Sequence, residues 1–175
     1  MWYAFKKLEG EIGVEIRLAT VVDMGEMRAV FDYGRAVQLE TGNLKQWEEG
    51  YPNEVLMRSD IEREAAHVCV DEAGEIVAVF SLFTDPDPTY TEIDGAWLND
   101  EPYATIHRIA TNGKVKGVGQ YCLKWVQDRF ANVRIDTHDD NEPMKYLMKK
   151  LDFAYCGVIT LENGDPRNAY HYVKA

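Results

Sequence analysis

The sequence predicts an α+β fold with a mixed, mostly antiparallel sheet of about seven strands. Three observations lead to this prediction. Three strand patterns lie within residues 11–83, one strand–loop–helix–strand unit occupies 103–137, and a helix with two further strand patterns follows it. The two strands of a βαβ unit are parallel when they share a sheet, so one central crossover should interrupt an otherwise antiparallel sheet.

The first strand is expected within 11–20, where apolar residues occupy alternate positions. Asp23 then provides a helix cap, and apolar residues at helical spacing continue to about Glu40. The next predicted elements are a helix at 53–66 and two Val-rich strands at 67–71 and 76–83, joined by a Gly-containing turn. Residues 84–102, rich in Pro and acidic residues, are expected to form either a wall of a substrate site or a short strand joined by ordinary turns.

The second half begins with the βαβ unit, whose parts are a strand at 103–111, a helix at 118–130 and a strand at 131–137. After it, Asn141 caps a helix in which apolar residues recur at i, i+3, i+4 and i+7, ending near Leu151. Strands at 153–161 and 168–173 complete the chain.

Length and composition favour one globular domain over the whole chain. The 175 residues are too few for two ordinary domains, and 46% of them are hydrophobic. Any loosely ordered extension is expected to be confined to residues 1–10. No apolar run is long enough to span a bilayer, and Met1–Gly10 lacks a signal-peptide pattern, so the expected location is the cytoplasm.

The formal net charge of -11 argues against a nucleic-acid partner and against an anionic membrane surface, because both require clustered Lys and Arg. The same charge favours a cationic small molecule over an anionic one. Cys69, Cys122 and Cys156 lie in apolar segments without metal-ligand spacing, so we expect buried thiols and no metal site.

The loop before the predicted helix at 118–130 has the character of an anion-binding site. Gly117 and Gly119 stand where the helix begins, so backbone N–H groups there can approach an anion closely. A dinucleotide site would have a third glycine, but that position is Cys122, and the unit occurs only once. Coenzyme A is the other ligand class that uses such a loop.

Two motifs resemble those of the GNAT superfamily of acyl-CoA-dependent N-acyltransferases. The sequence Lys114-Val115-Lys116-Gly117-Val118-Gly119 resembles the family's pyrophosphate motif, with Lys114 in place of Arg or Gln and a slightly shortened loop before it. The segment 141–153 resembles the second motif at Asn141, Lys150 and Phe153. It departs at Met148, where the family often has a tyrosine that protonates the leaving thiolate, and at Asp152, where a glycine is usual.

This resemblance implies an α/β/α sandwich with a V-shaped split between the fourth and fifth strands, where acetyl-CoA would lie as co-substrate. Backbone groups of Ile109 and Thr111 would pair with the pantetheine arm, and Asn141 would reach its thioester end. The pyrophosphate would be held by the N–H groups of Lys114, Val115, Lys116, Gly117, Val118, Gly119 and Gln120. The resemblance also leaves a homodimer open as an alternative to a monomer.

The catalytic groups are less clearly specified by the sequence. His107 is the first candidate for the general base, because its side chain titrates in the useful range and it lies on the central strand. Glu92 is an alternative base, as are Glu101 and His138. For the acid, Tyr170 on the last strand is preferred over Tyr146, and a thiolate can also leave without a dedicated acid.

These features predict an N-acetyltransferase that moves an acetyl group to a primary amine by direct attack in a ternary complex. The substrate is expected to be a small, cationic or amino-acid-like molecule, because aromatic and acidic residues populate the irregular segments. The expected substrate pocket consists of Trp47, Tyr51, Tyr90 and Trp97. The alternative is a non-catalytic module that binds acyl-CoA as a regulator or sensor, which the missing tyrosine at Met148 would favour.

Overall fold

A computed structural model describes residues 12–175, which form eight strands in one mixed sheet. The strand order is β1-β2-β3-β5-β6-β8-β7-β4, and every neighbouring pair is antiparallel except β5 and β6. The strands are β1 (Val14–Leu18), β2 (Ala66–Asp71), β3 (Ile76–Phe83), β4 (Asp94–Gly95), β5 (Ala104–Thr111), β6 (Asn132–Thr137), β7 (Ala154–Thr160) and β8 (Pro166–Val173).

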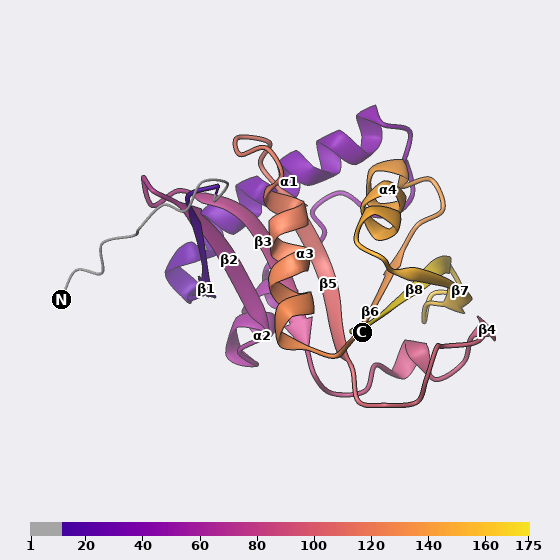
Figure 1. Ribbon diagram of the computed structural model, residues 1–175. Helices are drawn as coiled ribbons and strands as arrows, with labels where there is room; N and C mark the ends of the chain where they lie inside the picture. The colour runs from indigo at the N-terminus through magenta and orange to yellow at the C-terminus, as the bar shows by residue number, and fades with distance from the viewer. Residues whose placement is uncertain (1–11) are drawn as a thin grey trace.

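The helices cover both faces of the sheet and give three layers (Figure 1). One face packs against α1 (Met24–Glu40) and α2 (Glu54–Glu62), through a cluster that includes Phe31, Met57 and Val79. The other face packs against α3 (Val118–Arg129) and α4 (Glu142–Lys150), through a larger cluster that includes Leu123 and Met148. Short 3-10 turns lie at Val21–Asp23 and Pro88–Tyr90.

The parallel strands β5 and β6 are paired only at their beginnings. The register contains two pairs, Ala104 with Val133 and Thr105 with Arg134, after which the strands diverge. Figure 1 shows them spreading apart toward the N-terminus of α3. Beyond Thr105, β5 therefore has a partner strand on its β3 side only, and the edge facing β6 opens into a split.

A β-bulge in β5 lies next to this split. Two residues of β5, Arg108 and Ile109, stand opposite the single residue Phe80 of β3, and Arg108 adopts a left-handed φ of 54°. Its guanidinium donates two hydrogen bonds, of 2.8 and 2.9 Å, to the buried carboxylate of Asp60 on α2. Ser81 donates a third bond of 2.6 Å to the same carboxylate. This buried bidentate pair fixes the bulge and thereby the direction of the adjacent His107.

The predicted elements are confirmed, with differences at their ends and at one strand. β1 begins at Val14 and α2 ends at Glu62, inside the predicted ranges. The two-residue β4 adds an eighth strand to the seven expected, because Asp94 and Gly95 pair with Val158 and Gly157 of β7. The expectation for residues 1–10 lies outside the described part of the chain. Within residues 12–175, no helix is both long and apolar enough to cross a membrane.

Candidate active site

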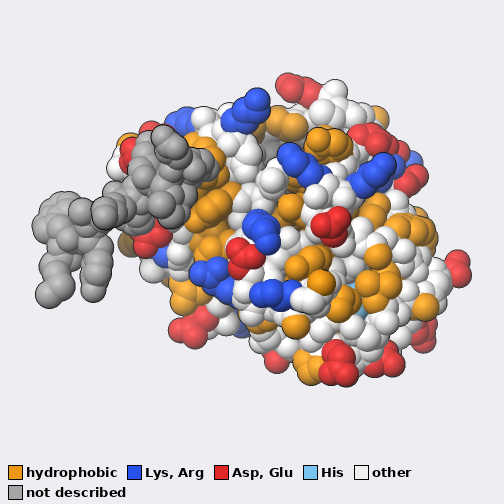
Figure 2. All heavy atoms as spheres, viewed as in Figure 1, with side chains coloured by type: hydrophobic (Ala, Val, Ile, Leu, Met, Phe, Trp, Pro, Cys, Tyr) orange, Lys and Arg blue, Asp and Glu red, His pale blue; other side chains and the backbone are white. Residues whose placement is uncertain are grey.

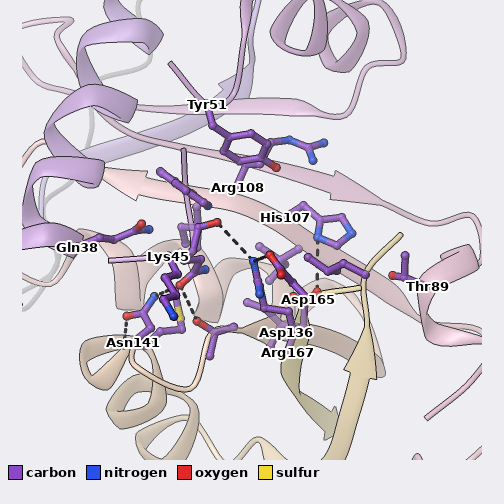
Figure 3. Close-up of a pocket in the computed structure, with 18 of the residues that line it drawn as sticks. Gln38, Lys45, Tyr51, Thr89, His107, Arg108, Asp136, Asn141, Asp165 and Arg167 are labelled. Carbon is purple, nitrogen blue, oxygen red and sulfur yellow. Dashed lines mark hydrogen bonds and ion pairs between the residues drawn. The ribbon is translucent and has the colours of Figure 1, made fainter. Parts of the chain in front are cut away.

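A cavity of about 430 Å³ lies where β5 and β6 separate, and Figure 3 shows residues that line it. It is bounded by β5, β6, the start of α4, the loop 41–53 and the loop between β7 and β8. Its polar and aromatic lining residues are Gln38, Lys45, Gln46, Trp47, Glu48, Tyr51, Asp87, Thr89, His107, Arg108, Asp136, Thr137, Asn141, Asn163, Asp165 and Arg167.

His107 lies in this cavity between two carboxylates. Its Nε2 is 2.6 Å from Oδ2 of Asp87, and its Nδ1 is 3.9 Å from Oδ2 of Asp136 (Figure 3). Asp87 comes from the loop after β3, and Asp136 comes from β6, across the split. Strand alternation explains the placement: Ile106 packs on the α3 side, so the neighbouring His107 faces the opposite side of the sheet.

Asp87 is held in its ionised form. Burial alone would raise the pKa of this carboxyl, but hydrogen bonds from His107 and Thr89 outweigh burial and lower the pKa to about 2. An ionised carboxylate can only accept hydrogen bonds, so Nε2 of His107 must carry the proton that it shares with Asp87. The lone pair of a neutral His107 is then on Nδ1, which has no hydrogen-bond partner among residues 12–175.

Asp136 is oriented by a buried tyrosine. The hydroxyl of Tyr90 donates a bond of 2.7 Å to Oδ2 of Asp136. Burial, together with the charge of Asp136, raises the pKa of Tyr90 well above its usual value, so the hydroxyl remains a donor. Trp97 helps to fix Tyr90 in this position, because its Nε1 donates a hydrogen bond of 2.9 Å to the backbone oxygen of Tyr90.

The loop 41–53 forms a wall of the cavity and is tied to elements on both sides of the split. Oε1 of Gln46 accepts hydrogen bonds of 2.8 Å from the side-chain amides of Asn43 and Asn141. On the opposite side, Trp47 packs edge-on against Phe31 of α1. The loop thus connects α1 with the beginning of α4.

The predicted anion site lies at the N-terminus of α3. Gly117 is the N-cap and adopts a left-handed φ of 80°, and a Cβ at this position would meet no atom within 4 Å. The first N–H groups of the helix have no intrahelical partners and carry the positive end of its dipole. Lys and Arg side chains gather over α3 and α4 on the face seen in Figure 2, so this face is locally basic despite the acidic chain.

Lys114 and Asn141 both have side-chain partners within the protein. The ammonium of Lys114 pairs with Glu75 of the β2–β3 hairpin at 2.7 Å. Asn141 caps α4 by accepting from the N–H of Met144 at 3.2 Å, and its amide is bonded to Gln46. Asn141 lines the cavity, with its side chain already engaged.

Only some of the other predicted site residues line the cavity. His107, Trp47 and Tyr51 line it, whereas Tyr90 and Trp97 lie in the layer that supports Asp136. Glu92 is exposed in a separate shallow groove near β7, and Tyr170 packs into the α3 and α4 core.

The two departures from the second motif have distinct structural settings. Met148 is fully buried among core residues. Asp152 adopts a left-handed φ of 59° directly after α4, which is a position where glycine is favoured at a helix end. Aspartate tolerates this conformation better than most residues, so the chain turns there without glycine.

Several cavity residues were not predicted as site residues. Asp87 and Asp136 are separated by 49 positions in the chain and meet only because β6 lies beside β5. Arg108 is brought to the cavity by the bulge, and Arg167 by the pairing of β8 with β6. For Asp136, Arg108 and Arg167 the sequence signal is their polar character within strands, and for Asp87 it is the acidic segment 84–102 that was one candidate for a wall of the substrate site.

We expect Asp87 to contribute to stability in a pH-dependent way. Because its pKa is lowered on folding, its contribution is complete above the unfolded value near 4 and is lost as the pH falls through about 2. The difference in unfolding free energy between wild type and Asp87→Asn should therefore shrink by about 2 kcal/mol between pH 5 and pH 2. Urea titrations across this range measure it, and a constant difference would contradict the hydrogen-bonded, ionised state of Asp87 in the folded protein.

Comparison with known proteins identifies the family. The sequence matches no protein-family model and no curated protein sequence. A GNAT-family acetyltransferase structure from Streptococcus agalactiae is 30% identical, with a TM-score of 0.83 over 93% of this chain and 96% of that one. A GNAT-family acetyltransferase structure from Listeria monocytogenes is 17% identical, with a TM-score of 0.68 over 91% and 94% of the two chains. A third, described as a putative acetyltransferase from Staphylococcus aureus, is 21% identical, with a TM-score of 0.65 over 90% and 97%. The chain therefore belongs to the GNAT family of acetyltransferases.

Proposed function

We propose that the protein transfers an acetyl group from acetyl-CoA to the primary amine of a small, cationic or amino-acid-like substrate. The observation that carries this proposal is the position of His107. His107 lies beside the split in the sheet. Its Nε2–H donates a hydrogen bond to Asp87, so the lone pair of Nδ1 can accept a proton. A group with these properties is suited to remove a proton from an attacking amine, directly or through water.

The α3 side of the split fits the acyl donor. The β5 edge beyond Thr105 lacks a partner strand on its β6 side, so backbone groups near Ile109 and Thr111 are available to an extended pantetheine arm. The amides at 115–117 and 119–120 and the open Gly117 position suit the pyrophosphate. The N–H of Lys114 is already donated to Oδ1 of Asn112, and that of Val118 to the backbone oxygen of Val115. Acetyl-CoA supplies an acetyl group activated as a thioester.

The opposite side of the split fits an amine. Glu48, Asp87, Asp136 and Asp165 contribute carboxylates to the cavity lining. All four attract an ammonium group to the cavity, and Asp87 and Asp136 flank His107. Trp47 and Tyr51 add apolar surface against which the rest of a small molecule can pack.

The acetyl group can pass directly from the sulfur of CoA to the amine nitrogen, with no covalent enzyme intermediate. The ammonium first loses a proton, and the neutral nitrogen then forms a bond to the acetyl carbon. The carbon–sulfur bond breaks, its electron pair stays on sulfur, and the nitrogen loses a second proton. One of the two protons ends on the thiolate and the other reaches solvent, with His107 as the first acceptor. No tyrosine takes the place of the motif's acid at Met148, so His107 or water returns the proton to sulfur.

The activity is tested by following free thiol with acetyl-CoA and a panel of primary amines. We expect His107→Gln to lower kcat by about 100-fold, because general base catalysis contributes at least that much. His138→Gln is the matched control, since His138 lies outside the cavity lining and should retain activity. Equal losses in both variants would contradict the role of His107. Binding of acetyl-CoA without thiol release for any amine would instead support the non-catalytic alternative.

A second experiment tests the donor site. Gly117→Asp places a carboxylate at the N-terminus of α3 and should raise the KM for acetyl-CoA at least about tenfold through charge repulsion. The added Cβ meets no atom within 4 Å, but the left-handed φ of 80° strains any residue with a side chain, so thermal unfolding must first show that the variant folds. Lys124→Gln changes the net charge by the same amount on the exposed surface of α3, where Lys124 pairs with Asp128, and should leave the KM within about twofold. An unchanged KM in the Gly117→Asp variant would exclude this loop as the pyrophosphate site.

A further inference from the structure

We propose that Arg167 binds a carboxylate of the acceptor, so that the substrate is an amino acid or another amine with a carboxylate close to the reacting nitrogen. This inference rests on the proposed acetyl transfer to an amine and makes its substrate class specific. It assigns Arg167 as a specificity-determining residue.

Sheet geometry places Arg167 at the acceptor side of the cavity. Asp136 of β6 is directly opposite Ala169 of β8, and Arg167 is two residues before Ala169. Arg167 and Asp136 therefore point to the same face of the sheet, one diagonal step apart, which corresponds to roughly 7–8 Å between backbones. His107 faces this side too, and all three residues line the cavity (Figure 3).

The guanidinium of Arg167 is buried but poorly neutralised. The residue is 5% exposed. Its Nη1 donates to the backbone oxygen of Pro166 at 2.9 Å, and its Nη2 donates to that of Gln46 at 3.4 Å. The nearest carboxylate, that of Asp165, is 4.0 Å away and half exposed. Five N–H donors thus have two hydrogen bonds, both to neutral carbonyl groups.

Two other arginines near the site are not available to a ligand in the cavity. Arg108 is bidentate to Asp60, so its charge is already balanced inside the protein. Arg134 does not line the cavity, and its guanidinium lies 4.3 and 4.0 Å from the ring centres of Trp97 and Tyr103. Arg167 is therefore the buried cation of the cavity that can form an ion pair with a ligand.

A carboxylate is the ligand group that best matches this cation. A buried charge without a close counterion is unfavourable, and a planar carboxylate satisfies a guanidinium with two parallel hydrogen bonds. The exposed ammonium of Lys45 also lines the cavity and adds attraction for an anion. Because Asp87 and Asp136 repel a carboxylate and attract an ammonium, a zwitterionic amino acid is oriented with its amine toward His107.

The test compares acceptors with and without this carboxylate, each assayed at a pH well above the pKa of its own amine so that differences in amine basicity do not enter. The panel contains the common amino acids and, for each accepted one, its carboxamide and its decarboxylated amine. With wild-type protein, we expect kcat/KM for the carboxamide and for the amine to be about 10- to 100-fold below that of the amino acid, the worth of a charge-assisted hydrogen-bonded pair.

Substitution of Arg167 should remove this preference specifically. Arg167→Gln is expected to reduce kcat/KM for the amino acid to that of its carboxamide, while the carboxamide value changes little. Arg167→Lys keeps the charge without the bidentate geometry and should restore part of the preference. Arg58→Gln is the matched control, because Arg58 is an exposed residue of α2 paired with Glu54, and it should keep the full preference.

The possible results separate this inference from the proposed function. Thiol release with carboxamides and amines as fast as with amino acids would overturn the carboxylate assignment while leaving acetyl transfer intact. An equal loss for acid and carboxamide in Arg167→Gln would also overturn it, since that pattern indicates a structural role. If a thermal unfolding assay shows that Arg167→Gln does not fold, the comparison of acceptors with wild-type protein decides whether a carboxylate is recognised. Absence of thiol release with every acceptor would overturn both proposals.

Discussion

The arrangement of the site depends on how far β5 and β6 remain paired. Two register pairs hold the strands together at their beginnings, and the divergence beyond Thr105 leaves an open β5 edge in the middle of the sheet. Unpaired backbone groups at such an edge are normally covered by another strand. Here the split instead connects the α3 face, where the donor is proposed to bind, with the opposite face, where the carboxylates and Arg167 lie. The bulge at Arg108, fixed by Asp60, sets the direction of His107 at this junction.

Much of the fold follows from local sequence patterns. Alternation in the strands, helical spacing of apolar residues and caps such as Asn53 and Asn141 act over a few residues, so the elements could be predicted within a few positions. The anion loop could be predicted for the same reason, because Gly117 and the helix start are adjacent in the chain. The two-residue β4 was only one of two alternatives for residues 84–102, since its pairing with β7 depends on tertiary contact.

The acceptor side could be predicted only in part. His107 lies on a recognisable strand, but Asp87, Asp136 and Arg167 come from three distant segments that meet through sheet topology. Tyr90 and Trp97 were expected in the pocket because aromatic residues in irregular segments often line ligands. They instead lie beneath it, where the Tyr90 hydroxyl and the Trp97 indole each have a buried partner. The pairing of the Lys114 ammonium with Glu75 likewise joins segments that are distant in the chain, so no local pattern indicates it.

Donor and acceptor are expected to bind on opposite faces of the sheet and to meet at the split beside His107. A crystal structure with a bisubstrate analogue, an amino acid whose nitrogen is joined to the sulfur of CoA through an acetyl linker, tests this most directly. The phosphates should lie at the N-terminus of α3, the linker beside His107, and the amino-acid part on the side of Asp136 and Arg167. An amino-acid part bound on the α3 and α4 face, or a linker remote from His107, would contradict the account.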